Sequence, residues 1–169
     1  MKNVKLFVVA ALLAGIGQVA SAQHAGHSGH SGHMSQSGQE REAMTHDQLR
    51  VAVQEICPVT GQKLGSMGAP VKAKIGQEEV FLCCQGCLKG KVNKDHWATI
   101  HANAAKAQAN CPVMNKSLPE NPKWTIVEGQ IVYICCPPCA KKIEADPKTY
   151  LGKVDELYAA SLNARHASQ

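Results

Sequence analysis

The chain has 169 residues and a formal net charge of +5, which is too small and too scattered a charge to indicate a nucleic-acid-binding protein. Two Trp, three Tyr and two Phe are few aromatic residues for a core of this size, whereas eight Cys and eight His are many. This composition is typical of a protein held together by disulfides or metal ions, not by a large apolar core alone.

The first 22 residues have the three parts of a secretory signal peptide. Two lysines precede an apolar stretch over 6–16, and small residues at Ala20 and Ala22 mark a cleavage position after Ala22. The apolar stretch is too short to cross about 30 Å of hydrocarbon comfortably. We therefore expect an exported protein, periplasmic or secreted, with no stable membrane insertion after cleavage and with its thiols in an oxidising compartment.

Residues 23–40 form a low-complexity segment in which histidine recurs every third residue. The four histidines, separated by Gly, Ser and Ala, are His24, His27, His30 and His33. Because such a segment has little to bury, we predict that it is disordered without a ligand. Neutral imidazole is a good ligand for Cu²⁺, Ni²⁺ and Zn²⁺, so we predict a flexible, exchangeable metal site in this segment.

A helix is predicted over about 41–56. Leu49, Val53 and Ile56 follow one another at helical spacing, and Thr45 is a suitable N-terminal cap. The helix leads into the strongest signal of the sequence, which is an internal repeat.

The repeat has two copies, which open with Cys57-Pro58-Val59 and Cys111-Pro112-Val113 and are 54 residues apart. Gln54 and Gln108 each precede the opening cysteine by three residues. Each copy then carries three more cysteines, 52 residues from their counterparts: Cys83, Cys84 and Cys87 in the first, and Cys135, Cys136 and Cys139 in the second. The repeat indicates that one structural unit occurs twice.

The first copy is predicted to form a β-hairpin followed by a helix. Strands at 71–75 and 80–82 flank a turn at Gly76-Gln77, and the alternation of apolar and charged residues favours the first strand. A helix is expected over 88–100, continuing through an alanine-rich stretch to 109.

The second copy repeats this pattern. Strands at 124–127 and 131–134 flank a turn at Glu128-Gly129, and a helix over 140–145 follows. Asp146-Pro147 is expected to end that helix, and a final helix is predicted near 154–162.

The eight cysteines are the candidate metal ligands of the two copies. A hairpin brings its ends together, so each opening cysteine is expected to lie near the later three. The Cys-x-x-Cys spacing of Cys84 with Cys87, and of Cys136 with Cys139, lets a tight turn direct two sulfur atoms at one ion. Four thiolates suit Zn²⁺ or Cu⁺, whereas Mg²⁺ and Ca²⁺ prefer oxygen ligands.

Two other roles for the cysteines stay open. An oxidising compartment favours structural disulfides, although adjacent cysteines such as Cys83 and Cys84 are awkward in a disulfide framework. Cys136 and Cys139 have the spacing of a thiol–disulfide oxidoreductase, although no thioredoxin-like pattern of strands and helices surrounds them. No phosphate loop, nucleophile elbow or zinc-protease helix is present in the sequence, so an enzyme is not expected beyond that redox alternative.

The two copies resemble the YHS/TRASH group of small metal-binding domains over roughly 57–152. The likeness lies in the opening Cys-Pro-Val, the hairpin, the cysteines at the strand end and the closing Asp146-Pro147-Lys148-Thr149-Tyr150-Leu151. The resemblance implies a fold similar to treble-clef fingers and a role in sensing, trafficking or resistance for copper and other heavy metals. The cysteines that match the group's pattern are Cys57, Cys83 and Cys87 in the first copy and Cys111, Cys135 and Cys139 in the second.

We therefore expect an α+β fold made of two tandem treble-clef-like modules that follow a disordered histidine-rich tail. The expected divisions are a signal peptide at 1–22, the tail at 23–40, a first module with its leading helix at 41–104, a second module at 105–155 and a C-terminal helix or tail at 156–169.

The expected function is binding of copper, or next zinc, for periplasmic sequestration, buffering or hand-over to a metal efflux or delivery protein. The alternatives are a thiol–disulfide oxidoreductase and an interaction module stapled by zinc or disulfides.

Overall fold

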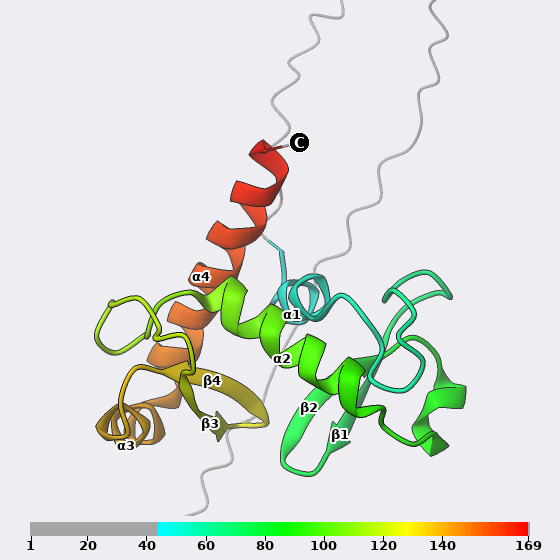
Figure 1. The fold of residues 1–169 in the computed structure, drawn as a ribbon, viewed down its shortest axis with the longest axis horizontal. Coiled ribbons are helices and arrows are strands. Elements are labelled where there is room, and N and C mark those ends of the chain that lie inside the picture. Colours follow the sequence, from blue (N-terminus) through cyan, green and yellow to red (C-terminus); the bar gives the residue numbers. More distant parts are fainter. Residues whose placement is uncertain (1–43, 169) are drawn as a thin grey trace, which may run out of the picture. The chain divides into compact units, whose positions relative to one another are not determined.

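The computed structural model describes residues 44–168 (Figure 1). The predicted signal peptide and the histidine-rich segment, with His24, His27, His30 and His33, lie outside the described residues. Within 44–168 the helices accompany two separate two-stranded antiparallel sheets, which confirms the α+β class. The treble-clef architecture of the modules stays a prediction.

The elements follow one another as two hairpins interleaved with helices (Figure 1). They are α1 (His46–Gln54), β1 (Val71–Ile75), β2 (Glu78–Leu82), the 3₁₀ helix η1 (Gln85–Lys89), α2 (Lys94–Gln108), β3 (Lys123–Val127), β4 (Gln130–Ile134), α3 (Pro138–Ala145) and α4 (Pro147–Ala167).

Both predicted hairpins are present. β1 pairs with β2 so that Val71 lies opposite Leu82, and β3 pairs with β4 so that Lys123 lies opposite Ile134. The turn of the second hairpin is Glu128-Gly129, with φ angles of 51° and 80°. Positive φ at both central residues is typical of a type I′ turn, whose twist matches that of the flanking strands.

The turn of the second hairpin also touches the first hairpin. The Glu79 N–H donates to the carbonyl oxygen of Gly129 at 2.7 Å. A Cβ atom on residue 129 would lie 2.7 Å from Cγ of Glu79, so this position needs glycine for the close approach as well as for its φ. The two copies of the repeat are therefore joined through their hairpins.

The helix α1 has the predicted cap at Thr45, but it begins at His46 and ends at Gln54, so it is shorter than the predicted 41–56. Thr45 and Gln48 form a reciprocal capping box at its N-terminus. The helix stops at Gln54 because Glu55 takes a φ of 65°, and Ile56 pairs with Lys63 in an isolated β-bridge instead of continuing the helix.

The prediction of a helix from residue 88 is wrong at its start. Residues Gln85–Lys89 form η1, after which Gly90 has extended backbone with φ −80° and ψ 153°. The Asn93 side chain then accepts the N–H groups of Asp95 and His96, which starts α2 at Lys94. The expected continuation into the alanine-rich stretch is present, since α2 runs to Gln108.

Asp146-Pro147 separates α3 from α4, as predicted. The Asp146 side chain accepts the N–H of Thr149 and so caps α4. This last helix is longer than the predicted 154–162, because it begins directly at Pro147. None of the helices within 44–168 has both the length and the apolar character needed to span a bilayer.

The described residues bury two apolar clusters, and cysteines belong to both. The larger cluster gathers side chains of α1, α2, the second hairpin, α3 and α4, and it includes Cys111 and Cys139. The smaller cluster lies around the first hairpin and includes Cys57, Cys83 and Cys87. The sulfur atoms are therefore part of the packed interior and are held in place by it.

Candidate metal centres

Each copy of the repeat brings three of its four cysteines together. The Sγ atoms of Cys57, Cys83 and Cys87 all lie within 4.8 Å of one another, and we call them the first triad. Those of Cys111, Cys135 and Cys139 do the same and form the second triad. In each triad one cysteine comes from the loop before the hairpin, one directly follows the second strand, and one lies in the next helix, which is η1 in the first copy and α3 in the second.

A repeated tight loop presents the opening cysteine. The Gly61 N–H donates to the carbonyl of Cys57 at 2.9 Å, and the Asn115 N–H donates to that of Cys111 at 2.8 Å. Gly61 and Asn115 have φ angles of 72° and 53°, a region that glycine and asparagine enter more readily than other residues. The loop therefore has the same shape in both copies.

A buried glutamine holds each loop against its hairpin. The Gln54 side chain donates to the carbonyl of Phe81 at 2.6 Å and accepts the N–H of the same residue at 2.8 Å. Gln108 makes the equivalent pair with Tyr133, at 2.7 and 2.9 Å. The repeat marked these glutamines in the sequence, but their role as clamps between the opening cysteine and the strand-end cysteines was not predicted.

The thiols of the first triad differ in acidity. Burial raises the pKa of Cys57, but hydrogen bonds from the backbone N–H groups of Cys83, Thr60 and Val59 outweigh it and lower the pKa to about 6. Burial raises the pKa of Cys87 to about 12, and the neighbouring thiols add to the effect. Of these two thiols, that of Cys57 is therefore the more readily ionised.

The second triad shows the same division. Burial raises the pKa of Cys111, but the N–H groups of Cys135, Met114 and Val113 lower it overall. Burial is the main cause that raises the pKa of Cys135 and of Cys139. In both copies the backbone stabilises negative charge on the opening cysteine.

The fourth cysteine of each copy lies beside its triad. The Sγ of Cys84 is 3.8 Å from that of Cys87, and the Sγ of Cys136 is 3.8 Å from Cys135 and 3.4 Å from Cys139. Cys84 and Cys136 are half-buried, and all eight cysteines of the described chain have free thiols. The six triad cysteines are the ones that match the YHS/TRASH-like pattern in the sequence, and Cys84 and Cys136 are the two that fall outside it.

The sulfur separations fit a thiolate-bound cation. Zinc–sulfur bonds of about 2.3 Å place the sulfur atoms of a tetrahedral site about 3.8 Å apart. Cys83 and Cys87 are 3.7 Å apart, and Cys135 and Cys139 are 4.0 Å apart. Thiolates select soft or borderline ions, so the donor set fits Cu⁺ or Zn²⁺.

The two centres differ beside the opening cysteine. The Thr60 hydroxyl lies 3.4 Å from the Sγ of Cys83. The corresponding residue of the second copy is Met114, whose side chain is exposed. The second triad therefore has no hydroxyl at the position where the first triad receives one.

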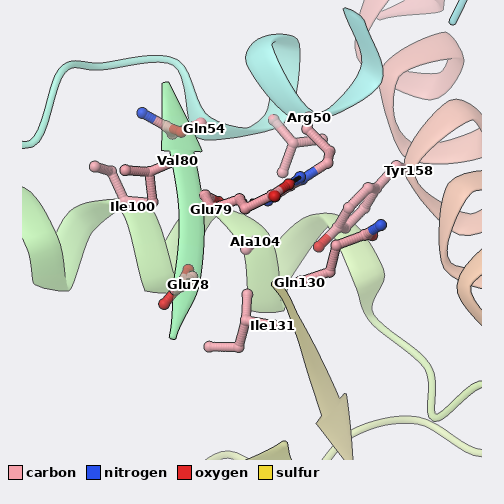
Figure 2. Close-up of a pocket in the computed structure, with 11 residues that line it drawn as sticks. Arg50, Gln54, Glu78, Glu79, Val80, Ile100, Ala104, Gln130, Ile131 and Tyr158 are labelled. Atoms are coloured by element: carbon pink, nitrogen blue, oxygen red, sulfur yellow. Dashed lines mark hydrogen bonds and ion pairs between the residues drawn. The ribbon is translucent and has the colours of Figure 1, made fainter. Parts of the chain in front are cut away.

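A cleft between the copies is separate from the triads (Figure 2). It is lined by residues of α1, α2, β2, β4 and α4, none of which is a cysteine or a histidine. The Arg50 guanidinium lies across it toward Glu79, with 3.5 Å between Nη1 and Oε2. Burial raises the pKa of Tyr158 in its wall. This cleft is lined by both polar and apolar side chains of the two copies and offers no thiolate ligands.

Comparison with known proteins finds no family model, no curated protein and no solved structure that matches this chain.

Proposed function

We propose that this protein binds a soft heavy-metal ion at each cysteine triad, with copper as the first candidate and zinc as the second. The observation that carries the proposal is the duplicated triad: two separate stretches of sequence fold into the same loop and each brings three thiols within bonding distance of one ion. Chance clustering of thiols does not explain why the same arrangement occurs twice in one chain.

The proposed role is sequestration, buffering or hand-over of the metal outside the cytoplasm. The predicted signal peptide supports export, and the histidine-rich segment supports capture of Cu²⁺ or Zn²⁺ at modest affinity. The triads then hold the metal tightly, as Cu⁺ in the case of copper. A metal efflux or delivery protein is the proposed partner.

The test is a count of zinc ions by native mass spectrometry on the full chain, made metal-free and then loaded. We expect Cys57→Ser to lower the count by one, and Cys57→Ser with Cys111→Ser to lower it by two. The matched control is Cys84→Ser, which removes a sulfur outside the triad and should leave the zinc count unchanged. Equal counts in all four proteins would contradict the proposal.

One observation favours thiol–disulfide exchange as a second candidate. A hydrogen bond from the Cys87 thiol is the main cause that lowers the pKa of Cys84, and the two sulfurs are 3.8 Å apart. A half-buried thiol of lowered pKa beside a second thiol is the arrangement of a redox pair. Reduction of insulin by the metal-free protein, lost in Cys84→Ser, would establish this activity; a metal-binding protein shows no turnover.

A further inference from the structure

The four sulfur atoms of the second copy form two triangles that share an edge. One triangle is the second triad, within 4.8 Å throughout. The other joins Cys135, Cys136 and Cys139, with edges of 3.8, 4.0 and 3.4 Å. Cys136 is close to two members of the triad but does not belong to it. Its Sγ atom therefore lies more than 4.8 Å from that of Cys111.

This arrangement does not match a single tetrahedral ion. In a four-thiolate zinc site all six sulfur–sulfur edges are equal, at about 3.8 Å. Here the edge between Cys111 and Cys136 is too long. The three edges of the triangle formed by Cys135, Cys136 and Cys139 are already short enough for the three sulfur atoms to bind one ion. An ion at the centre of that triangle would lie about 2.2 Å from each sulfur, close to the length of a metal–thiolate bond.

We propose that the second copy holds two Cu⁺ ions that share the thiolates of Cys135 and Cys139. One ion occupies the second triad, and the other occupies the triangle that Cys136 completes. The inference rests on the proposed function, because it assigns a second ion to the same centre. Cu⁺ is soft and accepts three thiolates, and a thiolate can bridge two such ions; zinc in proteins takes four ligands and fills one position.

Binding of copper at this centre exchanges protons for metal ions. Two Cu⁺ ions displace the protons of the four cysteines to solvent and bind four thiolates through six copper–sulfur bonds, because Cys135 and Cys139 each bridge both ions. The net charge of the centre is −2, and no electron is transferred because copper is supplied as Cu⁺. Cys111 and Cys139 are buried, whereas Cys135 and Cys136 are half-buried. The second ion therefore lies on the more open side of the centre, where a partner can remove it first.

The test uses the full chain with the first triad disabled by Cys57→Ser and Cys87→Ser, so that changes in copper count report the second copy. The chain is titrated anaerobically with Cu⁺, and native mass spectrometry counts the ions. Adding Cys136→Ser should lower the count by one, while the zinc count stays the same and shows that the variant still folds. The matched control is Met114→Leu, which removes a neighbouring sulfur and should change neither count.

Copper X-ray absorption gives the second readout. We expect a short copper–copper distance in the loaded protein and its loss in Cys136→Ser. An unchanged copper count in Cys136→Ser, a loss of one ion in Met114→Leu, or the absence of the copper–copper distance would each overturn the two-ion centre. A zinc count that ignores the triad cysteines would instead overturn the proposed function, so the two failures are distinguishable.

Discussion

At the scale of single residues, the glutamine three positions before each opening cysteine organises the cysteine triad of its copy. Gln108 is fully buried and pairs both backbone groups of Tyr133, two residues before Cys135. Its Nε2 also donates to the carbonyl of Asn110, in the loop that presents Cys111. One side chain thus ties together the two segments that supply the second triad.

We predict that Gln108→Met lowers the free energy of unfolding of the metal-free protein by about 2–4 kcal/mol. The substitution keeps the size of the side chain but leaves the two buried backbone groups of Tyr133 and the partly buried carbonyl of Asn110 without this partner. Each buried group left unpaired costs about 1–3 kcal/mol before relaxation. Urea denaturation under reducing conditions measures the change. The control is Gln77→Met at the exposed turn of the first hairpin, where we expect a change within about 0.5 kcal/mol. Equal effects of the two substitutions would refute the clamp.

The buried phenol of Tyr158 makes the free energy of unfolding depend on pH in the alkaline range. Burial is the main cause that raises its pKa in the folded chain. Between about pH 10, where an exposed tyrosine titrates, and the higher folded pKa, the unfolded chain loses a proton that the folded chain keeps. The contribution of the protonated Tyr158 phenol to the free energy of unfolding is therefore fully present below about pH 10 and is lost as the pH rises further.

The measurement is the free energy of unfolding from pH 9 to 11.5 in the metal-free, reduced protein. One such group contributes a slope of up to about 1.4 kcal/mol per pH unit. We predict a smaller fall with pH in Tyr158→Phe than in the unaltered chain. Identical slopes would show that the phenol is not protected from ionisation.

At the scale of elements, the ends of α1 and α2 repeat an unusual backbone conformation. Glu55 and Ala109 occupy equivalent positions before the opening cysteines and have φ angles of 65° and 53°. Side chains with a Cβ atom are strained there. In both copies this residue ends the helix and turns the chain into the cysteine loop.

We predict that Ala109→Gly stabilises the fold by about 1 kcal/mol, because glycine adopts positive φ without the steric cost of a Cβ atom. Ala109 is exposed, so little packing is lost. Chemical denaturation measures the change. The control is Ala102→Gly at an exposed position inside α2, which should destabilise the protein by about 0.5–1 kcal/mol. A loss of stability in Ala109→Gly would contradict this account of the helix end.

How well each element could be predicted depends on how local its determinants are. The hairpins follow from short-range alternation and turn residues, and the structure places their strands within two residues of the prediction. The start of α2 was misplaced because Leu88 and the lysines near it favour helix, whereas Gly90 and the Asn93 cap decide the boundary. The length of α4 was missed because its core contacts come mainly from α1 and α2, which are distant in sequence.

The candidate site, too, could be predicted from the sequence only where its determinants are local. The spacing of the cysteines pointed to two clusters, because a hairpin must return the chain to its starting point. The YHS/TRASH-like pattern left Cys84 and Cys136 out of the two clusters. It did not show how close these two sulfur atoms lie to the triads, since that depends on the rotamers and backbone after the strand. Nor did it show the clamp by Gln54 and Gln108, whose partners lie 25 to 27 residues away.

At the scale of the whole molecule, the two copies depend on each other. Their hairpins are joined at Glu79 and Gly129, and α1 packs against both α2 and α4. Because each triad sits within an apolar cluster, a metal ion bound there crosslinks loop and hairpin from inside the core.

Metal binding should therefore stabilise the entire fold. An ion that binds only the folded chain adds about 2.7 kcal/mol at a free concentration one hundred times its Kd. We predict that zinc raises the melting temperature of the reduced protein by several degrees, that a chelator reverses the shift, and that Cys57→Ser with Cys111→Ser abolishes it. Equal melting temperatures with and without zinc would contradict this coupling.

The most direct measurement is native mass spectrometry of the protein freshly isolated from its cells, with and without alkylation of thiols. If the triads are metal centres, the intact protein carries bound ions, its triad cysteines resist alkylation, and removal of the ions by a chelator makes them reactive. Protein that contains no metal, and whose cysteines are instead paired in disulfides that persist after chelation, would contradict the account.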